Sequence, residues 1–270
     1  TLAGIATLGD TIPTVGDKPA TGYEAGSWNE TPASDTTISS DAECTYTYKL
    51  ITYTITYDLD GGTVDGTNPV IYTVESDDIT LTNPTREGYT FAGWTGTGAT
   101  NPVTIAKGST GNRSYTATWN ANGDTAYTVE HYQQNLDGTY SLVETENLTG
   151  ATDSMVTATV KAYEGFTHNP AVEGTLLSAT VAGNGSTVLS VYYDRNTYTV
   201  SYDLNGGTVG EDVQTQFEGI RHGDTTPTID DPARTGYIFA GWTPEVTDTV
   251  TGDVTYVAQW TPVTFDIDVQ

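Results

Sequence analysis

The stretch TYTITYDLDGGT, residues 52–63, decides the fold class, and it returns almost unchanged as TYTVSYDLNGGT at residues 197–208. In the first copy Tyr53, Ile55 and Tyr57 alternate with threonines, which is the period-two pattern of a half-buried β-strand. The Gly-Gly segment that follows is typical of a tight hairpin turn, because glycine readily adopts a positive φ. The sequence therefore predicts two copies of a strand-turn unit.

A second motif follows each copy, REGYTFAGW at residues 86–94 and RTGYIFAGW at residues 234–242, and a closing strand then ends in tryptophan. A degraded third copy at residues 9–28 keeps only the glycine, tyrosine and tryptophan of this motif. Its closing strand has Leu50 in place of the last tryptophan, so core packing explains that position better than recognition. The structural motif residues are Gly22, Tyr23, Trp28, Gly88, Tyr89, Trp94, Trp119, Gly236, Tyr237, Trp242 and Trp260.

Helical periodicity is not sustained over any window of eleven or more residues. Only a short helix across a sheet would fit, in a polar stretch such as residues 73–83 or 212–222. The predicted fold class is therefore mainly β, α+β at most, built from tandem small antiparallel sheets. Brief linkers restrict bending between such modules, so we expect an elongated rod.

The motif order Y-D-x-[ND]-G-G-T, P-x-R-x-G-Y-x-F-x-G-W and T-Y-x-A-x-W resembles the Listeria-Bacteroides repeat, the B-repeat of internalin-type bacterial surface proteins. Between the two full copies, a V-x-x-x-Y opening strand, the segment YEGF at residues 163–166 and a closing V-x-Y-Y resemble the mucin-binding-protein (MucBP) family. These resemblances imply β-grasp-like modules of a secreted or cell-wall-attached bacterial adhesin, used as a stalk or co-receptor and without catalytic residues. Glycan or mucin contact is a further implication of the MucBP resemblance.

The domain organisation follows from these patterns. We expect a partial B-repeat-like module at residues 1–51, a full one at 52–122, a MucBP-like module at 123–196, another B-repeat-like module at 197–262, and at 263–270 the first strand of a following unit or a tail. The tail could also complete the truncated first module of a neighbouring molecule by strand addition. We otherwise expect a monomer.

The charge balance restricts the partners. Lys and Arg total 9 against 35 Asp and Glu, a net charge of −26, so nothing here would neutralise nucleic-acid phosphates or dock on anionic lipid. No apolar run is long enough to span a bilayer, so we expect no membrane insertion in this segment. Cys44 is the only cysteine, and its place in an alternating strand predicts a buried side chain, without a disulfide or a cysteine-based zinc site.

Binding remains an open alternative to the stalk, with a host or microbial surface glycan or protein as partner. Because the tryptophans fit a core, the candidate ligand contacts are the tyrosines of the middle unit, Tyr132, Tyr140 and Tyr192. Arg86 and Arg234 are better explained by solvation or a local ion pair than by recognition.

Catalytic and metal chemistry find no support in the sequence. The three histidines are scattered and no catalytic motif is present, so we expect no enzyme activity and no cofactor. The acidic clusters lack the spacing of a calcium loop, so no metal site is expected. A lysine crosslink to an asparagine or aspartate is a separate hypothesis, with Lys18, Lys49, Lys107 and Lys161 as the available amines.

Overall fold

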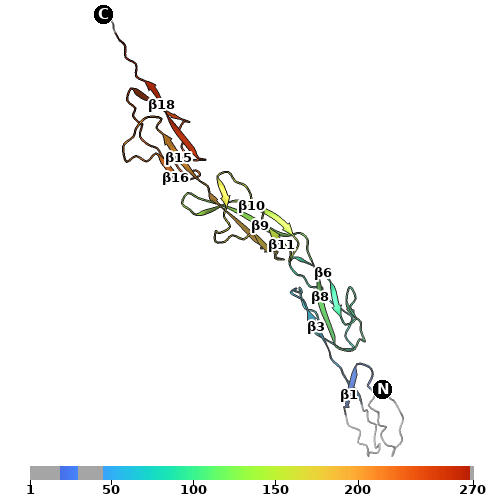
Figure 1. Ribbon diagram of the computed structural model, residues 1–270. Coiled ribbons are helices and arrows are strands. Elements are labelled where there is room, and N and C mark those ends of the chain that lie inside the picture. The colour runs from blue at the N-terminus through green and yellow to red at the C-terminus, as the bar shows by residue number, and fades with distance from the viewer. Residues whose placement is uncertain (1–18, 30–44, 268–270) are drawn as a thin grey trace, which may run out of the picture. The chain divides into compact units, whose positions relative to one another are not determined.

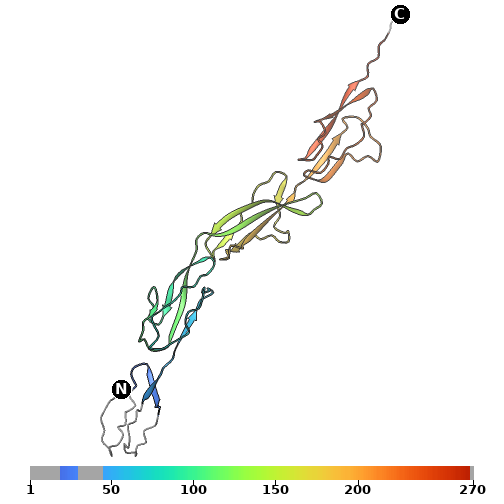
Figure 2. The same ribbon diagram turned by 180° about the vertical axis from the view of Figure 1, so that it is seen from behind.

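The computed structural model describes residues 19–29 and 45–267, and all regular elements in these ranges are β-strands (Figure 1). The view from behind likewise shows only strands and loops in the coloured part of the chain (Figure 2). The strands are β1 (Tyr23–Trp28), β2 (Tyr46–Leu50), β3 (Tyr53–Asp58), β4 (Ile71–Tyr72), β5 (Ile79–Thr80), β6 (Tyr89–Gly96), β7 (Thr104–Ile105), β8 (Arg113–Ala121), β9 (Thr125–Gln134), β10 (Tyr140–Gly150), β11 (Met155–Thr157), β12 (Phe166–His168), β13 (Ser178–Thr180), β14 (Val188–Arg195), β15 (Thr197–Asp203), β16 (Gln216–Arg221), β17 (Tyr237–Thr243) and β18 (Val254–Pro262).

The mainly-β prediction is confirmed. Residues 73–83 and 212–222, where a short helix was expected to fit, contain β5 and β16 instead. In residues 19–29 and 45–267 no helix is long and apolar enough to cross a membrane. Cys44 and residues 9–18 of the degraded motif copy lie outside the described residues.

The chain divides into two compact units, Thr1–Asn122 and Gly123–Gln270. We call β1–β2 the first module and β3–β8 the second module, both in the first unit. The third module is β9–β14 and the fourth is β15–β18, both in the second unit.

The second, third and fourth modules share one sheet topology. Their four-stranded sheets have the orders β4-β3-β8-β6, β10-β9-β14-β12 and β16-β15-β18-β17. In each sheet the two central strands run parallel to each other, and they are the first and the last strand of the module in sequence. The outer pairings are antiparallel. The expectation of purely antiparallel sheets is therefore wrong, because a long crossover returns the chain to the sheet in its original direction.

Each of these three modules has its own core, formed where the central parallel strands turn one face inward. In the second module Ile55 on β3 and Tyr115 on β8 are 2% and 1% exposed. In the fourth module Val200 and Tyr256 take the matching places, at 0% and 1%. The third module buries Val129, Leu189 and Val191 in the same way. The alternation read from the sequence is thus the alternation between core and solvent.

The geometry of the turn after β3 explains why both of its positions are glycine. Asp60 and Gly61 have φ of 45° and 80°, as the predicted tight turn requires. A Cβ on Gly62 would lie 2.4 Å from the ring of Trp119, whose indole Nε1 donates to the carbonyl of Leu59 over 3.1 Å. The first glycine therefore supplies a backbone conformation, and the second makes room for the tryptophan that ends β8.

The next strand, β4, pairs antiparallel with β3, but the prediction that the residues directly after the turn fold back on β3 as a tight hairpin is wrong. Thr63 does not pair with β3 but forms a bridge with Thr85, just before the second motif. Thr208 and Ala233 form the matching bridge in the fourth module. The turn therefore brings the first motif to the second, which lie far apart in sequence.

Candidate functional site

The three tyrosines expected to contact a ligand lie together on one face of the third module's sheet. Tyr132 on β9 faces Tyr192 on β14 across the parallel pair, and their rings stack with centroids 4.8 Å apart. Tyr140, at the start of β10, meets Tyr192 edge-on at 5.2 Å. Alternation causes this arrangement, because the neighbours Val129 and His131 turn into the core. We call these tyrosines with Glu130 and Asp194 the tyrosine face.

Two carboxylates accept hydrogen bonds from the hydroxyls of this face. Tyr132 Oη donates to Glu130, and Tyr140 Oη donates to Asp194, whose other oxygen accepts from Asn169 Nδ2 over 2.6 Å. The hydrogen bond to Glu130 raises the pKa of Tyr132 to about 12. Burial, together with the bond to Asp194, raises the pKa of Tyr140 to about 12. Both hydroxyls therefore remain protonated donors at neutral pH.

The rings of this face are partly occupied by one another. Tyr132 and Tyr192 cover each other's inner faces, so a sugar ring cannot insert between them without separating the stack. The half-buried outer surfaces and the oxygens of Glu130 and Asp194 remain as contact groups. Leu142, 49% exposed and paired with Tyr132 across the strands, extends the face with an apolar side chain. This chemistry suits a polyhydroxylated or amide-bearing ligand, which offers hydroxyl or N–H donors to the carboxylates.

The opposite face of the same sheet holds a polar cluster that the sequence patterns did not reveal. Its centre is His131, which is 0% exposed. His131 Nε2 lies 2.8 Å from Glu146 Oε1, and Nδ1 lies 3.0 Å from Tyr193 Oη. We call the following residues the His131 cluster: His131, Glu144, Glu146, Lys161, Tyr163 and Tyr193.

Lys161 joins the two glutamates of this cluster. Its Nζ lies 2.6 Å from Glu144 Oε1 and 2.7 Å from Glu146 Oε1. Tyr163 Oη donates to the second oxygen of Glu144 over 2.6 Å. These bonds to Lys161, helped by Tyr163 and His131, lower the pKa of both glutamates. The bond to Glu144 in turn raises the pKa of Lys161.

The stability of the third module is expected to fall at both ends of the pH scale. A lowered pKa means that Glu144 and Glu146 stabilise the fold above their unfolded pKa of 4.5, and that this stabilisation is lost as the pH falls through the folded value. The raised pKa of Lys161 adds stability below 10.5 that is lost as the pH rises through its folded value. Thermal unfolding followed by NMR at β9 amides between pH 3 and 7 measures the acid side, and Glu144→Gln should flatten it. A pH-independent midpoint would contradict the cluster geometry.

Trp94, Trp119 and Trp242 lie in or against the cores, and Trp28 and Trp260 lie against neighbouring aromatic rings. Trp94 is 7% exposed and belongs to the core of the second module. The others are half-buried, and each lies against an aromatic ring or a core: Trp28 on Tyr46, Trp119 on Phe91, Trp242 on Tyr202 and Trp260 on Phe239. Packing against neighbouring rings therefore accounts for all five tryptophans.

The arginine and tyrosine of the second motif pack against each other at the Gly-Gly turn. Arg86 lies 3.9 Å over the ring of Tyr89 and donates to the carbonyl of Asp60 over 2.9 Å, with an ion pair to its carboxylate at 3.5 Å. Arg234 and Tyr237 repeat the stacking at 4.1 Å, with the turn carbonyl of Asn205 as acceptor. Tyr237 is 38% exposed. Tyr237 therefore lies at the surface beneath an arginine and does not fill the core.

Acidic side chains serve local bonds. Asp78 accepts from the backbone of Lys107, and Asp77 pairs with its ammonium at 3.2 Å. In residues 19–29 and 45–267 no group of three or more His, Cys, Asp or Glu side chains is placed to hold a metal ion. Lys49 and Lys161 likewise pair with glutamates, at 2.6 Å each, and the fourth candidate for a crosslink, Lys18, lies outside the described residues.

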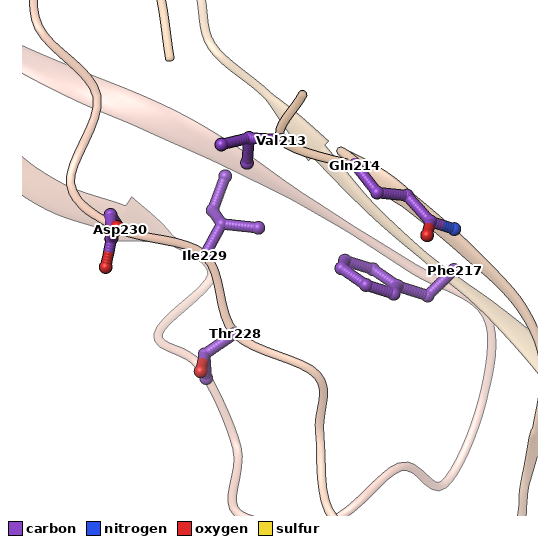
Figure 3. A pocket seen from close by; sticks show the side chains of 6 residues that line it. All are labelled: Val213, Gln214, Phe217, Thr228, Ile229 and Asp230. Carbon is purple, nitrogen blue, oxygen red and sulfur yellow. The ribbon is translucent and has the colours of Figure 1, made fainter. Parts of the chain in front are cut away.

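A shallow pocket in the fourth module does not coincide with the tyrosine face. It has a volume of about 320 Å³ between β16 and the segment 228–230 (Figure 3). In Figure 3 the side chain of Ile229 points toward Val213, and Phe217 lies on the other side of the opening. Phe217 and Ile229 also pack against the core of this module. The pocket is thus an open edge of that core.

Comparison with known proteins identifies the repeated modules. The Listeria-Bacteroides repeat domain family matches residues 53–112 and 198–265. The chain therefore carries two Listeria-Bacteroides repeat domains, as the motif order predicted. The matched segments leave out residues 123–196, so the resemblance of that unit to MucBP stays a prediction.

Two further proteins are similar to this chain. A protein described as a Gly-rich membrane protein, from Evansella cellulosilytica, is 25% identical over 75% of this chain, which spans about a quarter (24%) of that protein's length. Streptococcal High Identity Repeats in Tandem (SHIRT) domains 3-4 from a cell surface protein are 18% identical with a TM-score of 0.19, covering 51% of this chain and 99% of that one. A structural likeness this weak supports no conclusion about fold or function. Neither relative is described as an enzyme.

Proposed function

We propose that this chain is a non-catalytic repeat segment that serves as a stalk in a secreted or cell-wall-attached bacterial surface protein. The observation that carries the proposal is the repetition itself: three modules with one topology, two of them Listeria-Bacteroides repeats, each with its own core. Independent cores allow modules to be added in series without altering their neighbours. The net charge of −26 keeps such a segment soluble and self-repelling.

Small-angle scattering of the full chain tests the stalk. A compact chain of this length has a radius of gyration of about 18 Å. If the stalk proposal holds and four modules lie in line, each about as long as a nine-residue strand of roughly 30 Å, the expected rod is about 120 Å long with a radius of gyration of about 35 Å. A measured value near the compact figure would remove the stalk proposal.

A second candidate function is ligand binding by the unit at residues 123–196. The tyrosine face favours it, because three tyrosines and two carboxylates lie together on the outer face of the sheet, half-buried rather than in the core. The ligand would be a host or microbial surface glycan or protein. Aromatic faces and carboxylate acceptors are the groups that would hold a sugar's C–H and O–H surfaces.

A glycan array probed with the full chain tests this second function. Binding that disappears with Tyr140→Ala and weakens with Tyr140→Phe, which removes only the bond to Asp194, would support it. Tyr237→Ala is the matched control, because it removes an exposed tyrosine from a different module. Equal binding by all variants would exclude the tyrosine face.

A further inference from the structure

One backbone feature recurs in all four modules at the point where the chain leaves the sheet. A glycine immediately precedes the aromatic residue that begins β1, β6, β12 or β17, with φ of 86° at Gly22, 77° at Gly88, 76° at Gly165 and 83° at Gly236. Its carbonyl accepts a hydrogen bond from the first linker residue. These bonds are Ile51 to Gly22 at 3.0 Å, Asn122 to Gly88 at 2.9 Å, Asn196 to Gly165 at 2.8 Å and Val263 to Gly236 at 2.9 Å.

In the first unit this glycine lies directly beneath the next module. A Cβ on Gly22 would be 2.1 Å from Val74 Cγ1, so a larger residue would have to displace the Val74 side chain. Val74 stands two residues after Tyr72, which pairs with Tyr53 at the start of the second module. The neighbouring Tyr23 Oη donates to Glu75 over 2.6 Å. A module joint is thus built from the glycine of one module and the end of the second strand of the next.

The second unit repeats this joint with different side chains. A Cβ on Gly165 would be 2.2 Å from the ring of His222. His222 stands two residues after Ile220, which pairs with Tyr198, so it occupies the place of Val74. Its ring packs against Phe166 at 5.9 Å, and its carbonyl accepts from Arg195 Nη1 over 2.6 Å. Two joints with the same register and different chemistry identify the glycine as a shared docking position.

At Gly236 the same position is open. A Cβ there would meet nothing within 4 Å. The adjoining Tyr237 and Ile238 are 38% and 60% exposed. Val263 is nevertheless held by the glycine carbonyl as Ile51 and Asn196 are. Two residues further on, Phe265 is 83% exposed at the place where Tyr53 and Tyr198 begin their modules.

We propose that the surface around Gly236, Tyr237 and Ile238 is a docking site for another module of this same class, continued from Val263. The occupant would rest the side chain that ends its second strand on Gly236 and build its first strand from Phe265 onward. Continuity with the two filled joints selects this occupant, because the glycine, the linker bond and the register are the same at all three. The proposal goes beyond the stalk function, since it assigns a specific contact that fixes each module to the next.

The full chain tests the filled joint at Gly165. Gly165→Ala and Gly236→Ala impose the same backbone strain, at φ of 76° and 83°, but only the first also collides with a neighbouring module. In ¹⁵N relaxation of the parent chain the third and fourth modules should share one rotational correlation time. Gly165→Ala should separate the two times, and Gly236→Ala should leave them joined. In Gly165→Ala/His222→Ala the added methyl enters the space of the missing ring, so a shared time should return; this variant and the β14 amide shifts distinguish an opened joint from an unfolded module.

A second arm fills the open site. In a chain where residues 51–122 follow residue 262, Ile51 takes the place of Val263 and Val74 can reach Gly236. The appended module should tumble with the fourth module, and Gly236→Ala, silent in the parent chain, should now release it. Independent tumbling of the appended module, or equal effects of Gly165→Ala and Gly236→Ala in the parent chain, would overturn the proposal. So would concentration-dependent association of the parent chain that Gly236→Ala abolishes, because the site would then belong to a second copy.

Discussion

Replacing Trp94 by alanine is expected to lower the free energy of unfolding of the second module by about 3–5 kcal/mol. Trp94 is 7% exposed, and its indole packs against Phe91, Tyr57 and Tyr115 with centroids 5.6, 5.9 and 6.4 Å apart. The substitution removes these ring contacts and leaves a cavity, and both effects add to the cost. Amide exchange at Tyr115, on the central strand β8, measures the loss for this module alone, which whole-chain denaturation of a multi-module protein does not.

Two matched variants give this prediction its specificity. The indole Nε1 of Trp94 has no hydrogen-bond partner among the described residues, so Trp94→Phe loses only packing and should cost less than Trp94→Ala. Trp119→Phe should cost about 1 kcal/mol more than its change in packing, because Nε1 of Trp119 donates to Leu59. A loss below about 1 kcal/mol for Trp94→Ala, together with lost binding to any ligand, would indicate that the motif serves ligand recognition and not core packing.

The strands were largely predictable because alternation reports burial. The stretch at residues 53–58 alternates in sequence and in exposure, and β9 does the same from Thr125 to His131. The parallel pairing of β3 with β8 was not predictable, since alternation is the same in either direction. The two-residue strands β4, β5 and β7 were missed because one or two bridges leave no periodic pattern.

The candidate site was predictable only one residue at a time. Alternation indicates that Tyr132 and Tyr192 face away from the core, and they do. That the two rings stack on each other depends on the register of a parallel pair, which the sequence does not determine. His131 also follows the inward pattern, but its partners Glu146 and Tyr193 come from other strands, so the cluster was missed.

The glycine of the second motif illustrates a different limit. Its invariance across the motif copies indicates a turn, and its positive φ agrees. The contact that also requires glycine is made by the next module, through Val74 at Gly22 and through His222 at Gly165 of the segment YEGF. Because those two residues share no chemistry, a comparison of the repeats cannot reveal the joint. Their common distance from the second strand becomes visible only when the pairing register is known.

Replacing His131 by phenylalanine is expected to destabilise the third module by about 1–3 kcal/mol. The ring would keep most of its packing, but Glu146 and Tyr193 would each lose a hydrogen-bond partner at 2.8 and 3.0 Å. Tyr193 is buried, whereas the Glu146 side chain is 27% exposed and can be solvated in part. Both partners retain a second bond, Glu146 to the Lys161 ammonium and Tyr193 to the Lys161 backbone, which limits the cost. Amide exchange at Val129 and Val191 measures the change within this module.

The matched control is His168→Phe, for which the opposite sign is expected. His168 packs near the same Tyr193 ring, at 6.0 Å, but its Nε2 is buried without a hydrogen-bond partner among the described residues. The substitution removes an unsatisfied nitrogen and keeps the ring, so stability should stay the same or rise by up to about 1 kcal/mol. Two identical substitutions against one tyrosine thus separate packing from hydrogen bonding. If both variants lost stability equally, ring shape would be the cause, and the His131 cluster would be no more than polar filling of the core.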